Sequence, residues 1–353
     1  MIFGQVCAAL CAMDSKLKLI DRASFIRLAI LAIAIASVSI FGWSLTIWMP
    51  GQSYLQVLPP LSATKIKLQD RLKQDVETLA VKIGRRNVDN YQNLVAAKDF
   101  LDRELVQAGY LVREQNYTVD GKTFSNLEVE IPGSSRADEI LVIGGHYDRA
   151  VASYGANDRT GAAAVLALAR EFVGTKPMRT LRFVEFANGE PPLPGAKHIG
   201  SFRYAQRAKE QGEKIVGMFS LETLGYYSHQ ANTQKYPLLL NSLYPSQGNF
   251  LGFISDIDSR ELLRNTIRSF RAQAKFPSEG VALPDFIQGV GSSDRGSFWQ
   301  QGYQAVMITD TAPFRNPYYH TADDTVDKID FEKLSRVTDG ISKVIRDFVG
   351  LEG

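Results

Sequence analysis

The chain has 353 residues, with 40 Lys or Arg, 38 Asp or Glu and a net charge of +2. Residues 1–27 carry four basic and two acidic side chains, which leaves 36 of each sign in the remaining 326 residues. Because these 326 residues carry no net charge, the composition excludes a generally basic nucleic-acid-binding protein. Apolar content of 45% with charged content of 22% excludes a disordered chain, and the length allows an ample core.

The first predicted element is a membrane-spanning helix at residues 28–49, a run that contains no charged residue. A spanning helix needs about 20 such residues. Trp43 and Trp48 lie toward its far end, where aromatic rings favour the membrane interface, and Pro50 follows. All flanking positive charges are N-terminal. The positive-inside rule therefore predicts that residues 1–27 are cytoplasmic and that the domain after the helix is extracytoplasmic, in the periplasm or outside a bacterial cell.

A cleaved signal peptide is the main alternative for this segment. Its apolar region would span about 7–15 residues and end at a small-residue cleavage site, whereas this run is longer and ends in bulky residues. An uncleaved anchor is therefore favoured, and the one-sided positive charges argue against a buried core helix. Both cysteines, Cys7 and Cys11, precede the anchor, so the exported part has no disulfide or thiolate chemistry.

Residues 50–66 contain Pro59-Pro60 and are predicted to form an extended linker, and residues 67–353 to form one domain. Hydrophobic periodicity predicts helices at 66–83, 94–108, 161–172, 198–212, 259–273 and 330–348. It predicts strands at 110–119, 124–131, 140–148, 180–187, 214–222, 236–242 and 303–310. This alternation predicts an α/β fold, a three-layer α/β/α sandwich around a mostly parallel mixed sheet.

Function in such a sheet collects at the carboxyl ends of the strands. Acids and histidines follow four of the predicted strands, and two of the four histidines of the chain, His146 and His320, are among them. A single histidine or acid at a strand end is more often structural. The set, however, has the composition of a zinc site, because imidazole and carboxylate ligands suit Zn²⁺. Asp148 lies two residues after His146 and could accept a hydrogen bond that orients the imidazole.

These residues resemble, at their spacing and order, the M28 family of zinc exopeptidases, which includes aminopeptidases and the related glutaminyl cyclases. The resemblance covers roughly residues 67–349, nearly the whole domain. The segments that carry it are LVIGGHYDR, GANDRTGAAAVLALA, LRFVEFANGEPP, LETLGYY, SSDRGSFWQQGYQAVMITDTAPFRNPYYHTADDT and the closing helix.

The resemblance implies a two-zinc site. His146, Asp158 and Glu222 would hold one ion, and Asp158, Glu190 and His320 the other, so that Asp158 bridges the two. Many relatives have Asp at the position of Glu222, whose longer side chain can still bind a metal. The implied activity is release of the N-terminal residue from a peptide or protein.

Gly189 is the main departure from the family pattern, which has two consecutive glutamates here. The second matches Glu190, and the first is the general base that activates the attacking water. A positioned base usually adds a factor on the order of 10²–10⁴ in rate. The chain could therefore be a peptidase with a relocated base, or a weak or inactive binding protein. Glutaminyl cyclisation ranks lower, because it also needs this glutamate.

Two further residues bear on this question. Glu185 lies four residues before Gly189 on the same predicted strand, and it could reach the site only if the strand end bends. A solvated or ion-paired glutamate is the expectation there. Arg295 follows Asp294 where relatives often have His, and it is expected either to alter substrate binding or to lie on the surface.

Overall fold

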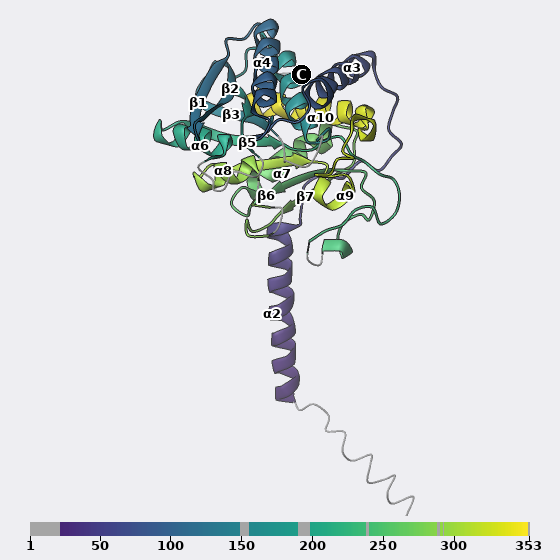
Figure 1. The fold of residues 1–353 in the computed structure, drawn as a ribbon. Coiled ribbons are helices and arrows are strands. Elements are labelled where there is room, and N and C mark those ends of the chain that lie inside the picture. Colours follow the sequence, from purple (N-terminus) through teal and green to yellow (C-terminus); the bar gives the residue numbers. More distant parts are fainter. Residues whose placement is uncertain are drawn as a thin grey trace, which may run out of the picture. The chain divides into compact units, whose positions relative to one another are not determined.

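The computed structural model of the chain describes residues 22–148, 155–189, 198–237, 240–287, 290–291 and 293–351. It divides into two units, one ending at Trp48 and the other, here called the body, beginning at Met49. The first unit contains helix α2 (Arg22–Thr46), which is long and apolar enough to cross a membrane (Figure 1). The predicted membrane segment at 28–49 thus falls largely on one helix.

The body is built on one eight-stranded mixed sheet with the order β1-β2-β4-β3-β5-β8-β6-β7. Its strands are β1 (Arg113–Val119), β2 (Lys122–Ile131), β3 (Arg136–His146), β4 (Arg179–Phe186), β5 (Lys214–Leu221), β6 (Leu251–Ser255), β7 (Ser278–Ala282) and β8 (Ala305–Thr309). The four central strands β4, β3, β5 and β8 are parallel to one another. Their carboxyl ends therefore meet at one edge of the sheet.

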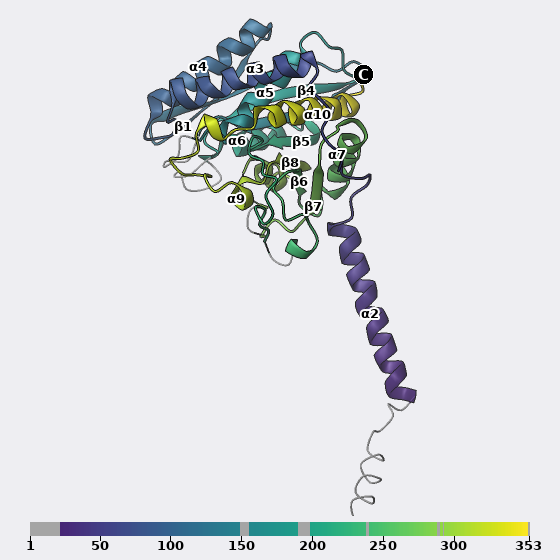
Figure 2. The same cartoon turned by 90° about the vertical axis from the view of Figure 1, so that its right-hand side faces the viewer.

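Helices cover both faces of the sheet. They are α3 (Ala63–Glu77), continued by a π-helical segment (Thr78–Ile83), α4 (Tyr91–Ala108), α5 (Arg159–Phe172), α6 (Gly200–Glu210), α7 (Arg260–Gln273), α8 (Asp294–Gln300), α9 (Ala312–Arg315) and α10 (Phe331–Val349). Two short 3₁₀ segments lie at Leu240–Ser242 and Val326–Lys328. Residues of α3, α4, α5, α7 and α10 form the larger core, and residues of α6 and α8 form the smaller core on the opposite face (Figure 2). The predicted α/β/α sandwich is confirmed.

The strands divide their side chains between these two cores with the period of two expected for a covered sheet. In β3, Leu141 and Ile143 enter the larger core, whereas Ile140 and Val142 enter the smaller one. The predicted hairpin of β1 and β2 is also confirmed. Its turn residues Asp120 and Gly121 have φ angles of 48° and 76°, as a two-residue turn with left-handed geometry requires.

The strand predicted at 236–242 is wrong for its described residues, because residues 240–242 form a 3₁₀ turn instead. Strands β6 and β7 were not predicted. Each has only five residues, and each contains a glycine, Gly252 or Gly280, that interrupts the pattern. Helix α3 begins at Ala63, inside the range predicted as linker, and Ser62 caps it by accepting from the Lys65 N–H.

Residues 49–61, here called the strap, contain no helix or strand but are fastened to the body. The Arg271 guanidinium donates to the carbonyls of Pro50 and Gly51 at 3.2 and 3.0 Å. Further along, Arg336 donates to the Pro59 carbonyl at 2.7 Å. A flexible spacer would leave these carbonyls to water, so the strap is better described as a packed part of the body.

Candidate active site

The predicted ligands lie at the carboxyl edge of the parallel strands. His146 is the last residue of β3 and pairs with Phe186, the last residue of β4. Glu222 directly follows β5, and its N–H donates to the Ile308 carbonyl of β8 at 3.1 Å. Asp158 immediately precedes α5. The N-terminus of α5 packs closely against the same strand ends, as shown by Gly161, on which a Cβ would lie only 2.9 Å from the Glu222 carbonyl oxygen. The parallel topology therefore brings distant segments to one place.

His146 lies between two carboxylates. Its Nδ1 is 3.4 Å from Asp148 Oδ1, and its Nε2 is 3.4 Å from Glu222 Oε2. Burial alone would lower the pKa of His146, but hydrogen bonding to Asp148 and Glu222 raises it well above its ordinary value. An imidazole with a carboxylate on one nitrogen and an open metal-binding position on the other is the usual arrangement around protein-bound zinc.

Asp158 and His320 form a second pair. His320 Nε2 is 4.0 Å from Asp158 Oδ2. His320 has a φ of 58°, in the left-handed region, and its ring stacks on Tyr319 with centroids 3.8 Å apart. Asp158 is buried, whereas His320 remains partly exposed at the edge of the site. The structure thus places a histidine and a carboxylate together at each of two positions.

A buried acid network, absent from the sequence prediction, supports Asp158. Asn157 donates its side-chain N–H to Asp310 Oδ2 at 2.8 Å, and its backbone N–H to Asp324 Oδ1 at 3.1 Å. Asp310 also accepts from the Tyr226 N–H. Burial, and then the charge of Asp158, raises the pKa of Asp324 to about 7. The network ties the residue before α5 to the loop that carries His320.

These pairs fit a zinc site by the chemistry of their donors. Ligand bonds of about 2.1 Å in tetrahedral geometry separate two donor atoms by about 3.4 Å, which is the separation of His146 Nε2 and Glu222 Oε2. Glu222 Oε1 is buried without a hydrogen-bond partner among the described residues. No group of three or more His, Cys, Asp or Glu side chains that could hold a metal occurs in the described part of the chain. The predicted ligand Glu190 lies outside that part.

Gly189, which the sequence resemblance assigns to the position of a general base, is packed into this site. Its N–H donates to Asp148 Oδ1 at 2.7 Å. A Cβ built on Gly189 would lie 2.7 Å from both Cβ and Cγ of His146, which is closer than such atoms approach. Any side chain at position 189 would therefore have to displace the Cβ and Cγ atoms of His146.

The Glu185 side chain does not take the place of the base that is missing at Gly189. It pairs with Gly145 and Leu127, and its neighbours Phe183 and Ala187 belong to the larger core. The expectation of a solvated or ion-paired side chain is wrong, because Glu185 is 1% exposed and neither oxygen has a hydrogen-bond partner in the part of the chain that the structure describes. Burial raises its pKa well above the ordinary value.

Asp294 and Arg295 begin α8 and are both buried. Burial raises the pKa of Asp294 to about 7; the nearby charge of His146 opposes this rise, and that of Glu222 adds to it. The surface alternative for Arg295 is wrong, because that side chain is 1% exposed. Its Nη1 lies 2.6 Å from the sulfur of Met307, and the guanidinium lies over the ring of Trp299. Arg295 thus packs within the smaller core.

Comparison with known proteins defines the class of protein. The model of peptidase family M28 matches residues 126–345, and the chain belongs to that family. The protein YfbL of Escherichia coli K12, described as uncharacterized, is 29% identical over 301 residues, which cover 82% of this chain and 91% of YfbL. Aminopeptidase YwaD of Bacillus subtilis is 24% identical over 253 residues, 69% of this chain. The chain spans about half the length of YwaD (50%) and of one probable leucine aminopeptidase of Trichophyton verrucosum (53%).

Solved structures share the fold. A zinc aminopeptidase from Bacillus subtilis superposes with a TM-score of 0.64 at 13% identity, covering 80% of this chain and 95% of the other. A glutaminyl cyclase from Bacteroides thetaiotaomicron gives 0.60 at 15% identity, with 81% and 98% covered. At these identities the likeness establishes the fold and leaves the two activities undistinguished.

Proposed function

We propose that this protein is a zinc-dependent aminopeptidase anchored in a membrane by α2. Membership of peptidase family M28 supports the reaction class. The observation that carries the proposal is the position of His146, between Asp148 on one ring nitrogen and Glu222 on the other. The one-sided positive charge of residues 1–27 supports a cytoplasmic N-terminus and an extracytoplasmic body.

His146 and Glu222 would hold one zinc ion, and Asp158, His320 and Glu190 would complete a second position, with Asp158 shared between the two. Zinc in such a site supplies Lewis acidity toward the amine and carbonyl of a peptide N-terminus. Asp148 would fix the tautomer and orientation of the His146 ring through Nδ1. The Gly189 N–H would in turn hold Asp148 in place.

The network of Asn157, Asp310 and Asp324 would give Asp158 its position. Asn157 is the residue before Asp158, and both of its hydrogen-bonded groups are buried. The open end of the site lies beside His320, the least buried of these residues, where an N-terminal residue could enter.

The second candidate function is a catalytically weak or silent binding protein, and Gly189 is the observation that favours it. A glycine offers no proton-accepting side chain, and loss of a positioned base usually costs a factor on the order of 10²–10⁴. Glutaminyl cyclase activity ranks below both, although one structural neighbour is such an enzyme.

An aminoacyl-substrate screen on the purified full chain tests the proposal. Zinc-replete protein should release N-terminal residues, and a chelator should abolish this release. His146→Ala should lose both zinc and activity, whereas His229→Ala, which alters an exposed loop histidine, should lose neither. Zinc binding without any hydrolysis would favour the binding protein, and no zinc binding would overturn both assignments.

A further inference from the structure

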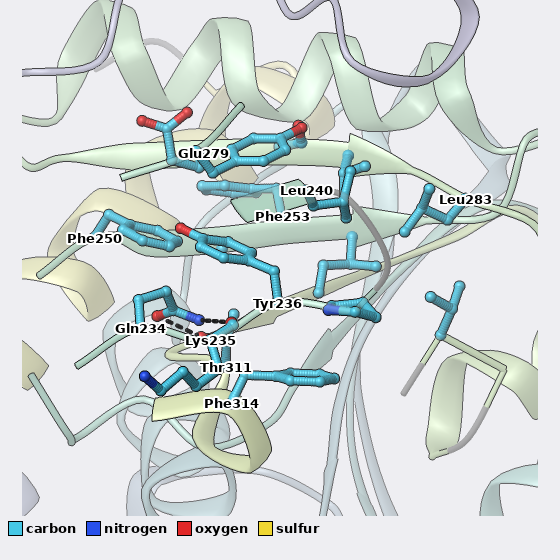
Figure 3. Close-up of a pocket in the computed structure, with 17 residues that line it drawn as sticks. Gln234, Lys235, Tyr236, Leu240, Phe250, Phe253, Glu279, Leu283, Thr311 and Phe314 are labelled. Atoms are coloured by element: carbon cyan, nitrogen blue, oxygen red, sulfur yellow. Dashed lines mark hydrogen bonds between the residues drawn. The ribbon is translucent and has the colours of Figure 1, made fainter. Parts of the chain in front are cut away.

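An apolar hollow lies in the body between β6, β7 and residues 234–237, 240 and 244. Its cavity volume is about 60 Å³, and about 540 Å³ when the open solvent at its mouth is included. Phe253, Leu283 and Phe314 surround it, and the Lys235 side chain extends away from the rings (Figure 3). Of the predicted metal ligands that the structure describes, none lines this space.

The polar groups around the hollow are already engaged with one another. Gln234 accepts from the Thr311 hydroxyl at 3.2 Å and donates to the Lys235 carbonyl at 2.8 Å. The Tyr244 hydroxyl donates to the Gly280 carbonyl at 2.8 Å. A peptide would need free groups for its amides, whereas a hydrocarbon chain needs none. The lining therefore suits a hydrocarbon chain.

The hollow also lies close to the start of the body. Gly280 of β7 lines it, and a Cβ on Gly280 would lie 3.0 Å from Cγ of Met49. Met49 is the first residue of the body and follows Trp48 directly. Met49 follows Thr46, the last residue of α2, by three positions, so the residue that contacts β7 is close along the chain to the apolar helix. Acyl chains are the hydrocarbon available in bulk at that point.

The surface beside the hollow has the composition of a membrane contact. Leu55 and Val57 of the strap are 87% and 92% exposed, and Phe286, three residues after Leu283, is 81% exposed. Lys235 is exposed near the mouth and makes no ion pair among the described residues. The one acid that lines the hollow, Glu279, is 3.8 Å from Arg271. Exposed apolar side chains beside a lysine match the boundary between acyl chains and anionic headgroups.

We propose that this hollow binds one acyl chain of an anionic phospholipid of the membrane that α2 enters, with the headgroup at Lys235. The proposal rests on α2 as the anchor and is independent of the peptidase activity. Bound lipid would hold the β7 side of the body at the bilayer surface, beside the attachment made by Met49.

Photo-crosslinking tests the proposal. The full chain is placed in vesicles that contain phosphatidylglycerol with a diazirine on its acyl chain, and labelled peptides are mapped. We expect labelling of residues 234–244 and 280–287 in addition to α2. Val281→Trp, which fills the hollow, should lower pocket labelling at least fivefold relative to α2 labelling. Leu111→Trp, at an exposed position away from the hollow, should leave it unchanged.

A second variant keeps the test decisive if Val281→Trp fails to fold. Lys235→Glu alters only an exposed side chain and should lower labelling by phosphatidylglycerol more than labelling by phosphatidylcholine. Labelling confined to α2, pocket labelling that persists in folded Val281→Trp, or equal labelling of Lys235→Glu by both lipids would overturn the proposal. So would displacement of the probe by an apolar peptide at concentrations that do not disturb the vesicles.

Discussion

Gly189 donates its backbone N–H to Asp148 Oδ1 at 2.7 Å. Gly189, the position that the sequence resemblance assigns to a general-base glutamate, therefore helps to hold Asp148 in place. Asp148 in turn lies 3.4 Å from His146 Nδ1, so the three residues form one continuous contact. The absence of a side chain at Gly189 allows this packing, because a Cβ there would meet His146.

Gly189→Glu should therefore fail to raise the aminopeptidase rate, although it restores the family's residue. Its Cβ would displace His146 and weaken zinc binding, and overpacking should cost about 1–3 kcal/mol of unfolding free energy. Zinc content, hydrolysis rate and thermal unfolding of the variant are the measurements. Gly217→Ala is the control, because its Cβ would meet only the flexible end of Leu262. A gain on the order of 10²-fold or more in rate would contradict this account and show that the site lacks only a base.

Asp148→Asn should lower zinc affinity by roughly 10–100-fold, the usual effect of losing the partner of a metal-bound imidazole. The amide keeps the size of the side chain but cannot stabilise the same His146 tautomer. Competition with a chromogenic chelator measures the affinity. Asp138→Asn, at an exposed acid on β3 away from the site, is the matched control. Equal affinities in the two variants would show that Asp148 does not orient His146.

Glu185→Met should stabilise the protein, since it replaces a buried carboxylate that has no hydrogen-bond partner among the described residues by an apolar side chain of similar length. We expect a gain of about 1–4 kcal/mol near neutral pH. The pKa of Glu185 is raised in the folded state, so its ionisation destabilises the fold only above the unfolded pKa. The gain should thus be small near pH 4 and should grow as pH rises toward the folded pKa.

Unfolding by denaturant at several pH values, with chelator present throughout, measures this dependence. Glu210→Met changes an exposed glutamate on α6 and should show neither the gain nor its pH profile. A pH-independent difference between Glu185→Met and the wild type would mean that Glu185 does not ionise within the tested range.

The orientation of the chain is open to a labelling test on intact cells. Cys7 and Cys11 are the only cysteines and precede α2. A membrane-impermeant maleimide applied from outside the membrane should leave them unlabelled, whereas it should label a cysteine introduced at Lys235 in the body. The reverse pattern would place the body in the cytoplasm and would contradict the positive-inside prediction.

Local sequence patterns predicted the parts of the fold in which local and tertiary preferences agree. The β1–β2 turn follows from Asp120-Gly121, and the closing helix from one apolar stripe that is buried along α10. Strands β6 and β7 were missed because five residues that include a glycine carry too little periodicity. The strand predicted at 236–242 is wrong for its described residues because a short apolar run does not determine the backbone conformation.

The strand-end residues of the site were also predictable, because chemistry in a parallel sheet collects at the carboxyl edge. His146 and Glu222 lie there as expected. Asp310 was missed although it directly follows the apolar strand β8, a signal that could have found it. The burial of Glu185 and Arg295 was not predictable, since charged residues are seldom buried and only the packing around them shows the exception.

The central claim is tested most directly by measuring hydrolysis of an aminoacyl substrate by the purified full chain, before and after zinc removal and after zinc is restored. The account predicts hydrolysis that disappears with chelator, returns with zinc, and is absent in His146→Ala but retained in His229→Ala. Hydrolysis that is indifferent to chelator, or protein that binds no zinc under replete conditions, would contradict it.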